Sequence, residues 1–125
     1  MNELQKSYYQ EMLQNDRLIP LTLDNRTCGL ITYILCNDMK DVENKDPWQI
    51  RRDIPEGDIV YIEQLIVKTS LTMQDFLRIF DCLMRIIREK HPNVSKIFWK
   101  RYNYRTHKTN LRIYNLNKEP NYVYN

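Results

Sequence analysis

The sequence predicts a mixed α+β fold, in which a mainly antiparallel sheet contains one strand–helix–strand crossover. An apolar run over Ile59–Val67, an amphipathic segment over Met73–Lys90 and a second apolar run over Val94–Trp99 predict the crossover. Two apolar runs, Arg17–Leu23 and Arg26–Cys36, are separated by two turn residues and predict a hairpin. Together they indicate one sheet with a long helix packed against it.

The length and composition fit one folded domain. The chain has 125 residues, of which 42% are hydrophobic and 28% are charged, a balance typical of a globular chain rather than a disordered one. We expect a core over residues 18–100, followed by a basic segment rich in Tyr and Asn over residues 101–125. Only Gly29 and Gly57 are glycines, so a glycine-rich phosphate cradle is not expected.

Charge is distributed unevenly along the chain. From Asn93 onward seven Lys or Arg residues stand against one acid, Glu119, so this part carries about +6 and the preceding part about −3. Such an asymmetry indicates either an acidic or phosphate-bearing partner or a solvated rim.

The cysteines and the N-terminus predict a cytoplasmic protein. Cys28, Cys36 and Cys82 lie in apolar patterns without a Cys-x-x-Cys pair, as expected of reduced core thiols. Residues 1–16 are polar and lack the apolar centre of a signal peptide. We expect no membrane span, because no run approaches the roughly 20 apolar residues that a span needs.

The first half of the chain predicts a helix, a hairpin and a loop. Apolar residues every four positions predict a helix over Asn2–Asn15. The pair Asp24-Asn25 tolerates positive φ and predicts an antiparallel hairpin. The charged stretch Asn37–Gly57 is long for a loop, and it either covers a site or contains a helical turn near Trp48–Arg52. We expect Trp48 and Ile50 to hold it against the body.

The central strand, Asp58–Lys68, is apolar on both faces, which predicts a strand covered on both sides. Glu63 and Gln64 interrupt its middle. Simple alternation predicts one face with Ile59, Tyr61, Leu65 and Val67, and the other face with Val60, Ile62 and Ile66.

The long helix has well-marked ends. Thr72 is the expected N-cap, and Asp75 three residues later completes a capping box. Pro92 ends the helix, and His91 beside it is interpreted as a cationic cap. The strand Ser95–Lys100 then returns parallel to the central strand. Asn110–Leu116 is a candidate edge strand.

The order of helix, hairpin, loop, central strand, long helix and strand resembles the core of the GNAT superfamily of N-acyltransferases, over roughly Leu18–Trp99. In that family the central strand ends in Leu-x-Val, which Leu65-Ile66-Val67 matches. The resemblance implies a GNAT-like three-layer core, whose helix, here Thr72–Lys90, holds the pyrophosphate of acyl-CoA at its N-terminus. The next strand splays away, and the pantetheine arm lies in the gap.

The family motif Gln/Arg-x-x-Gly-x-Gly/Ala is absent at this place. Thr72 takes the Gln/Arg position, Met73 and Asp75 take the glycine positions, and Leu77 takes the Gly/Ala position. The side chains of Met73 and Asp75 would crowd a phosphate cradle, and Asp75 adds negative charge where the ligand is negative.

The resemblance also implies site residues. Glu63 would be the general base, unless it is paired with an Arg or faces a wet cleft. Tyr104 or Tyr114 would protonate the departing thiolate, unless these rings serve packing. No metal is expected, because His91 and His107 lack ligand neighbours at metal-binding spacing. Acetyl-CoA or another acyl-CoA would contact six residues at the strand end and helix start: Ile66, Val67, Ser70, Thr72, Met73 and Gln74.

The run Trp99–Lys108 alternates aromatic and basic residues. This composition suits single-stranded nucleic acid, a solvated strand end or the rim of a CoA site.

Two functional hypotheses follow. In the first, the protein is a minimal N-acyltransferase that moves an acyl group from a thioester to an amine by direct attack. In the second, it is a catalytically inactive binding or regulatory module that contacts a protein or nucleic-acid partner through its basic C-terminal segment. The sequence identifies neither the substrate nor the oligomeric state.

Overall fold

The computed structural model describes residues 2–42, 48–68, 70–103 and 105–116, and it confirms the predicted mixed α+β class. A five-stranded sheet has the order β1-β2-β3-β4-β5, in which only the β3–β4 pair is parallel. The elements are α1 (Glu3–Gln14), β1 (Leu18–Leu23), β2 (Arg26–Cys36), β3 (Ile59–Val67), α2 (Met73–Lys90), β4 (Lys96–Asn103) and β5 (Lys108–Asn115).

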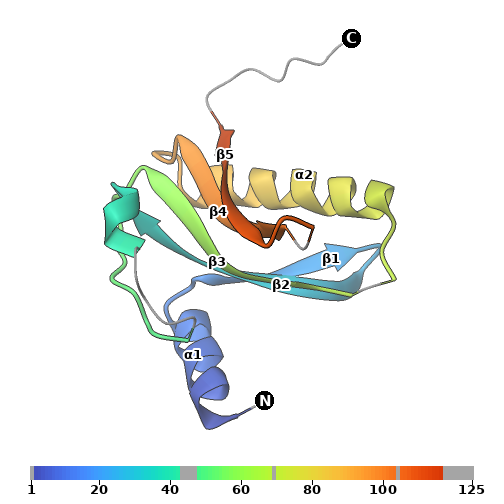
Figure 1. Cartoon of the computed structure of the whole chain (residues 1–125), viewed down its shortest axis with the longest axis horizontal. Coiled ribbons are helices and arrows are strands. Elements are labelled where there is room, and N and C mark those ends of the chain that lie inside the picture. Colours follow the sequence, from blue (N-terminus) through green and yellow to red (C-terminus); the bar gives the residue numbers. More distant parts are fainter. Residues whose placement is uncertain (1, 43–47, 69, 104, 117–125) are drawn as a thin grey trace.

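The two helices lie on opposite faces of the sheet (Figure 1). On one face, Ile79, Leu83 and Ile87 of α2 pack against the sheet side chains Ile31 and Val60. On the other face, α1 supplies Tyr8 and Met12 to a second cluster, which includes residues of β2, β3 and β4. The central strand is therefore covered on both sides over its first half. The sequence predicts cover along the whole strand, but Leu65 and Ile66 in the second half are 45% and 46% exposed.

The β1–β2 hairpin has the predicted turn. Asp24 and Asn25 have φ angles of 51° and 66°, the left-handed values that a two-residue hairpin turn needs. Further along β2, Gly29 lies opposite Val67 of β3. A Cβ at Gly29 would stand 2.1 Å from the Ile66 carbonyl oxygen, so only glycine fits this close backbone approach.

A β-bulge in β3 corrects the predicted faces of this strand. Tyr33 is paired with Ile62 and Thr32 with Gln64, so Glu63 is an extra residue without a partner in β2. One extra residue shifts the alternation by one position. Leu65 and Val67 consequently lie on the α2 face with Val60 and Ile62, and not with Ile59 and Tyr61 as simple alternation predicts.

Helix α2 has the predicted start. The Thr72 side chain accepts a hydrogen bond from the Asp75 amide at 3.1 Å, and the Asp75 carboxylate accepts one from the Thr72 amide at 3.2 Å. The Asp75 carboxylate thus lies at the positive end of the helix.

The loop between β2 and β3 differs from its prediction. Its helical turn is a 3-10 turn at Met39–Val42, and none lies at 48–52. Trp48 does anchor the loop, because it packs edge-on against Tyr8 and Tyr9 at ring-centroid distances of 5.7 Å. Ile50 does not, since 39% of it is exposed. Asp53 ties the loop to the sheet, because its carboxylate accepts hydrogen bonds from the Arg17 side chain and from the Leu35 amide.

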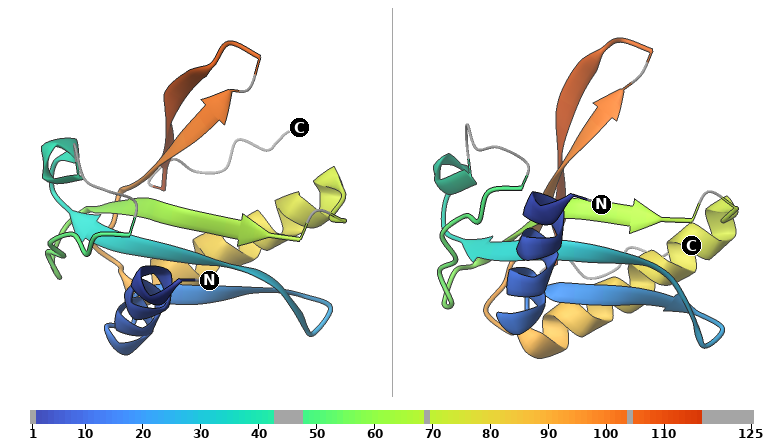
Figure 2. Two further views of the ribbon diagram at one scale, coloured as in Figure 1. Left: turned by 60° about the horizontal axis from the view of Figure 1, so that its bottom comes forward. Right: turned by 90° about the horizontal axis from the view of Figure 1, so that it is seen from below.

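The last two strands form a hairpin that rises away from the rest of the sheet (Figure 2). β4 continues three residues beyond its predicted end at Lys100, and β5 begins at Lys108, two residues before the predicted edge strand. His107 has a φ of 56° and closes the turn between them.

Candidate functional site

The parallel strands β3 and β4 separate halfway along their length. Their pairing runs only from Ile59 opposite Lys96 to Ile62 opposite Trp99, although both strands continue beyond it. The separation begins next to the bulge at Glu63, which increases the local twist of β3. Backbone groups of both strands therefore face a gap in the sheet.

An apolar pocket fills the root of this gap, beneath α2. It has a cavity volume of about 120 Å³, similar to the roughly 150 Å³ of cavities that hold one benzene molecule. It is lined by Leu21, Ile62, Glu63, Leu65, Phe76, Ile79, Phe80, Leu83, Trp99 and Lys100. The pocket is suited to an apolar group the size of one ring or one short acyl chain.

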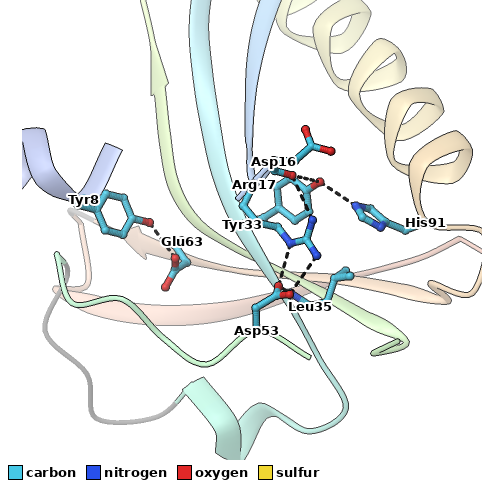
Figure 3. Close-up of polar contacts among 8 residues, drawn as sticks. All are labelled: Tyr8, Asp16, Arg17, Tyr33, Leu35, Asp53, Glu63 and His91. Carbon is cyan, nitrogen blue, oxygen red and sulfur yellow. Dashed lines mark hydrogen bonds and ion pairs between the residues drawn. The ribbon is translucent and has the colours of Figure 1, made fainter. Parts of the chain in front are cut away.

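The carboxylate of Glu63 points to the opposite face of the sheet (Figure 3). It accepts a hydrogen bond from the Tyr8 hydroxyl at 2.8 Å, and it forms an ion pair with Arg51 from the loop. The Tyr8 hydroxyl also lies 2.7 Å from the Thr32 hydroxyl. The Glu63 side chain is completely buried, and its carboxylate has the Arg partner that was one of the alternatives for the predicted general base.

Burial perturbs the titration of this group and of its partner. It raises the pKa of Glu63 above its usual value, although the hydrogen bond from Tyr8 and the Arg51 charge oppose the shift. Burial also raises the pKa of Tyr8, which therefore stays protonated at neutral pH. The neutral hydroxyl and the paired carboxylate form a structural polar network under α1.

A second network ties the loop, the sheet and the end of α2 together (Figure 3). Arg17 forms a bidentate ion pair with Asp53 at 2.8 and 3.0 Å. The Tyr33 hydroxyl lies 2.7 Å from Nε2 of His91. Burial, with the charges of Arg17 and Lys90, lowers the pKa of His91 below its usual value. His91 is the C-cap of α2, as predicted, and its amide donates a hydrogen bond to the Ile87 carbonyl at 2.8 Å. The lowered pKa favours the neutral ring beside Tyr33 over the cationic form that the sequence predicts.

The six residues predicted to contact acyl-CoA lie beyond the pocket, at the open end of the gap and the start of α2. Ile66 is 46% exposed and Met73 is 74% exposed, while Val67 packs on the α2-side core. Thr72 is the N-cap, and Ser70 and Gln74 are exposed. None of the six belongs to the pocket lining. Their role in cofactor binding stays a prediction.

The predicted tyrosine acids have different positions. Tyr114 in β5 is 37% exposed, and its ring packs edge-on against Phe80 of the pocket lining at 5.5 Å. Tyr104 lies outside the described residues. Within the described ranges, no three His, Cys, Asp or Glu side chains gather as metal ligands.

Several site residues were not identified from the sequence. Arg51 lies in the loop without a local pattern that indicates burial, and only the fold brings it to Glu63. Phe76 and Phe80 belong to the apolar stripe of the predicted helix, but a stripe does not reveal that a pocket opens beneath it.

No protein-family model matches this sequence, and no curated protein matches it. In the part of the chain that the structure describes, neither helix is long and apolar enough to cross a membrane.

Proposed function

We propose that the protein is a non-catalytic binding module on an acyltransferase-like scaffold, and that the pocket between β3 and β4 receives its ligand. The observation that carries the proposal is the separation of these strands after Ile62 and Trp99, over an apolar pocket. The ligand class is an extended peptide segment. Its backbone would add to the open edge of β3, and one apolar side chain would enter the pocket.

Two features favour binding without acyl transfer. The Glu63 carboxylate is committed to Tyr8 and Arg51 on the far face of the sheet. The Asp75 carboxylate occupies the positive end of α2, where an incoming pyrophosphate would meet a like charge. Both carboxylates make structural contacts, Glu63 where the family resemblance implies a general base and Asp75 where it implies a pyrophosphate site.

A minimal N-acyltransferase is the second candidate. The opening between β3 and β4 favours it, because an acyl-pantetheine arm is also an extended amide chain with an apolar end. Tyr114, whose ring touches the pocket residue Phe80, would then be the acid beside the thioester sulfur. Acetyl-CoA or another acyl-CoA would be the cosubstrate.

A cytoplasmic location suits either function. Cys28 and Cys36 are buried, Cys82 is half-buried, and all three are free thiols. Reduced thiols of this kind are typical of a reducing compartment.

Thermal unfolding with CoA and acetyl-CoA separates the two candidates. An enzyme that is saturated at millimolar ligand should unfold about 5 °C higher or more, and a peptide-binding module should not respond. A rise with acetyl-CoA that is lost on Leu65→Trp, which fills the pocket, would support the acyltransferase instead.

The pocket is tested directly by titrating indole in two-dimensional NMR. Because indole is an apolar ring with an N–H donor, we expect its shifts to concentrate on the pocket residues Leu83, Phe80 and Trp99, and to disappear in Leu65→Trp. Shifts spread over the whole surface, or unchanged in the variant, would contradict a binding pocket at this place.

A further inference from the structure

The β4–β5 hairpin is the strongest concentration of positive charge in the sequence. Residues 96–115 contain six Lys or Arg and no acid, so the hairpin carries +6 while the remaining chain has a net charge of −3. A polyanion that approaches the protein is therefore attracted by the hairpin and repelled by the rest.

The charges of the hairpin are accessible. Lys96, Lys100, Lys108 and Arg112 are all exposed, and none of these four forms an ion pair with another described residue. Figure 2 shows the hairpin standing clear of the rest of the sheet.

The four cations lie on both faces of the hairpin. Arg112 is opposite Trp99 and Lys108 is opposite Asn103, so both occupy the α2 side of the sheet. Lys96 and Lys100 occupy the alternate positions of β4 and lie on the other side. The charge therefore surrounds the hairpin instead of forming one flat patch.

We propose that the β4–β5 hairpin binds the phosphate backbone of a nucleic acid. Its exposed Thr109 and Asn110 lie between Lys108 and Arg112, and hydroxyl and amide groups donate hydrogen bonds to phosphate oxygens beside such cations. Eight-residue strands span about 26 Å, which is long enough to meet several successive phosphates. This inference goes beyond the pocket and does not depend on its ligand.

The surroundings favour phosphate contact over base stacking and over a membrane. Trp99 is half-buried and its ring packs edge-on with Phe80 at a centroid distance of 6.0 Å, so the ring is already engaged within the protein. The turn residues Arg105–Lys108 are polar and exposed, whereas a tip that enters a bilayer needs large apolar side chains. If the hairpin contacts the phosphates of the nucleic acid and not its bases, the binding affinity should depend strongly on the salt concentration and weakly on the nucleotide sequence.

The test is fluorescence anisotropy with a labelled 20-nucleotide single strand and the matching duplex, between 50 and 200 mM salt. With about four phosphate contacts, log K should fall with log salt at a slope of about −3 to −4, a loss of about 100-fold over this range. Comparing the affinities for the single strand and for the duplex shows which of the two forms of nucleic acid the hairpin prefers.

A pair of charge-matched variants makes the test specific. Lys108→Gln/Arg112→Gln should weaken binding at 50 mM salt by at least about 10-fold and reduce the slope by about two. Lys40→Gln/Arg85→Gln removes the same charge from exposed sites outside the hairpin and should change binding less than about twofold. All four side chains are exposed, so circular dichroism should show unchanged folding in both variants.

Three results would overturn the proposal. They are absence of binding to both oligonucleotides at 50 mM salt, an equal loss in the two double variants, and equal affinity for polyglutamate or for phosphatidylserine vesicles. Because the pocket ligand is probed separately with indole and CoA, failure here leaves the proposed binding function intact, and failure there leaves the hairpin result intact.

Discussion

At the scale of single residues, buried polar networks determine how the loop between β2 and β3 lies on the sheet. Arg51 and Asp53, two residues apart in the loop, pair with Glu63 and Arg17 of the body. A buried charge costs several kcal/mol unless a partner compensates it. Arg51 and Asp53 are therefore each held in place by the oppositely charged side chain with which they pair. These two ion pairs fix this part of the loop on the sheet.

Glu63→Gln tests the buried ion pair. The amide keeps an acceptor for Tyr8 but leaves the Arg51 charge buried without a carboxylate, so we expect a loss of about 3 kcal/mol in the free energy of unfolding, measured with urea. Tyr8→Phe removes the hydroxyl that is hydrogen-bonded to both Glu63 and Thr32, and it should cost about 1 to 3 kcal/mol. The double variant Glu63→Gln/Arg51→Met should recover most of the loss, and a cost larger than that of Glu63→Gln alone would refute this assignment.

His91 predicts a dependence of stability on pH. Its pKa is lowered in the folded state, so between that value and about 6.5 the unfolded chain binds more protons than the folded one. Stability is therefore lost as the pH falls below about 6.5. The pKa of Glu63 is raised in the folded state, so above the usual pKa of a glutamate this group lowers the stability as the pH rises, which is the opposite of the His91 effect. The measured change of the unfolding free energy with pH is the sum of both effects and does not report on His91 alone.

The His91 contribution is obtained by difference. Urea unfolding of the wild type and of His91→Gln at several pH values from 7.5 to 5 gives the stability that His91 adds at each pH. This difference should decrease as the pH falls, because only the wild type must keep a half-buried imidazole neutral. A difference that stays constant or increases would mean that folding does not lower the pKa of His91.

At the scale of elements, local sequence signals determine where helix α2 begins and ends, whereas pairing with a neighbouring strand determines the bulge in β3. The ends of α2 follow from Thr72, Asp75 and Pro92, because capping and proline geometry act within a few residues. The bulge in β3 depends on pairing with β2, since a bulge is defined by two residues opposite one. The helix boundaries were thus predictable, and the reversal of faces after Glu63 was not.

Thr72→Ala tests the capping box. It removes the acceptor for the Asp75 amide, and we expect a loss of about 1 kcal/mol in the free energy of unfolding. Ser70→Ala is the matched control, since Ser70 is an exposed residue just before the helix, and it should change stability by less than about 0.5 kcal/mol. Equal effects of the two substitutions would show that the cap contributes nothing specific.

At the scale of the whole molecule, the sheet is divided into a covered part and an uncovered part. β2 is buried over most of its length between α1 and α2, whereas the side chains of β5 are exposed from Lys108 to Tyr114. Cooperative stability concentrates where apolar burial is largest. The hairpin proposed to contact nucleic acid belongs to the uncovered part, and the pocket lies at the boundary between the two.

Amide hydrogen exchange tests this division. We expect the amides of Ile31–Leu35 to exchange only through global unfolding, and the amides near the tip of the hairpin, such as Lys108 and Asn110, to exchange at least about 100-fold faster through local opening. Equal protection of β2 and the hairpin tip would contradict it.

Local sequence patterns predicted the order of the elements, the hairpin turn at Asp24-Asn25, both ends of α2 and the parallel pairing of its flanking strands, because periodicity, capping and crossover geometry are local or nearly local rules. The sequence also marked Glu63 as a carboxylate that needs a partner. The folded chain was needed to show that the partner is Arg51, that a bulge at Glu63 brings Leu65 to the side of the pocket, and that β3 and β4 separate above this pocket. These features depend on residues brought together from distant parts of the chain, and no local pattern encodes such contacts.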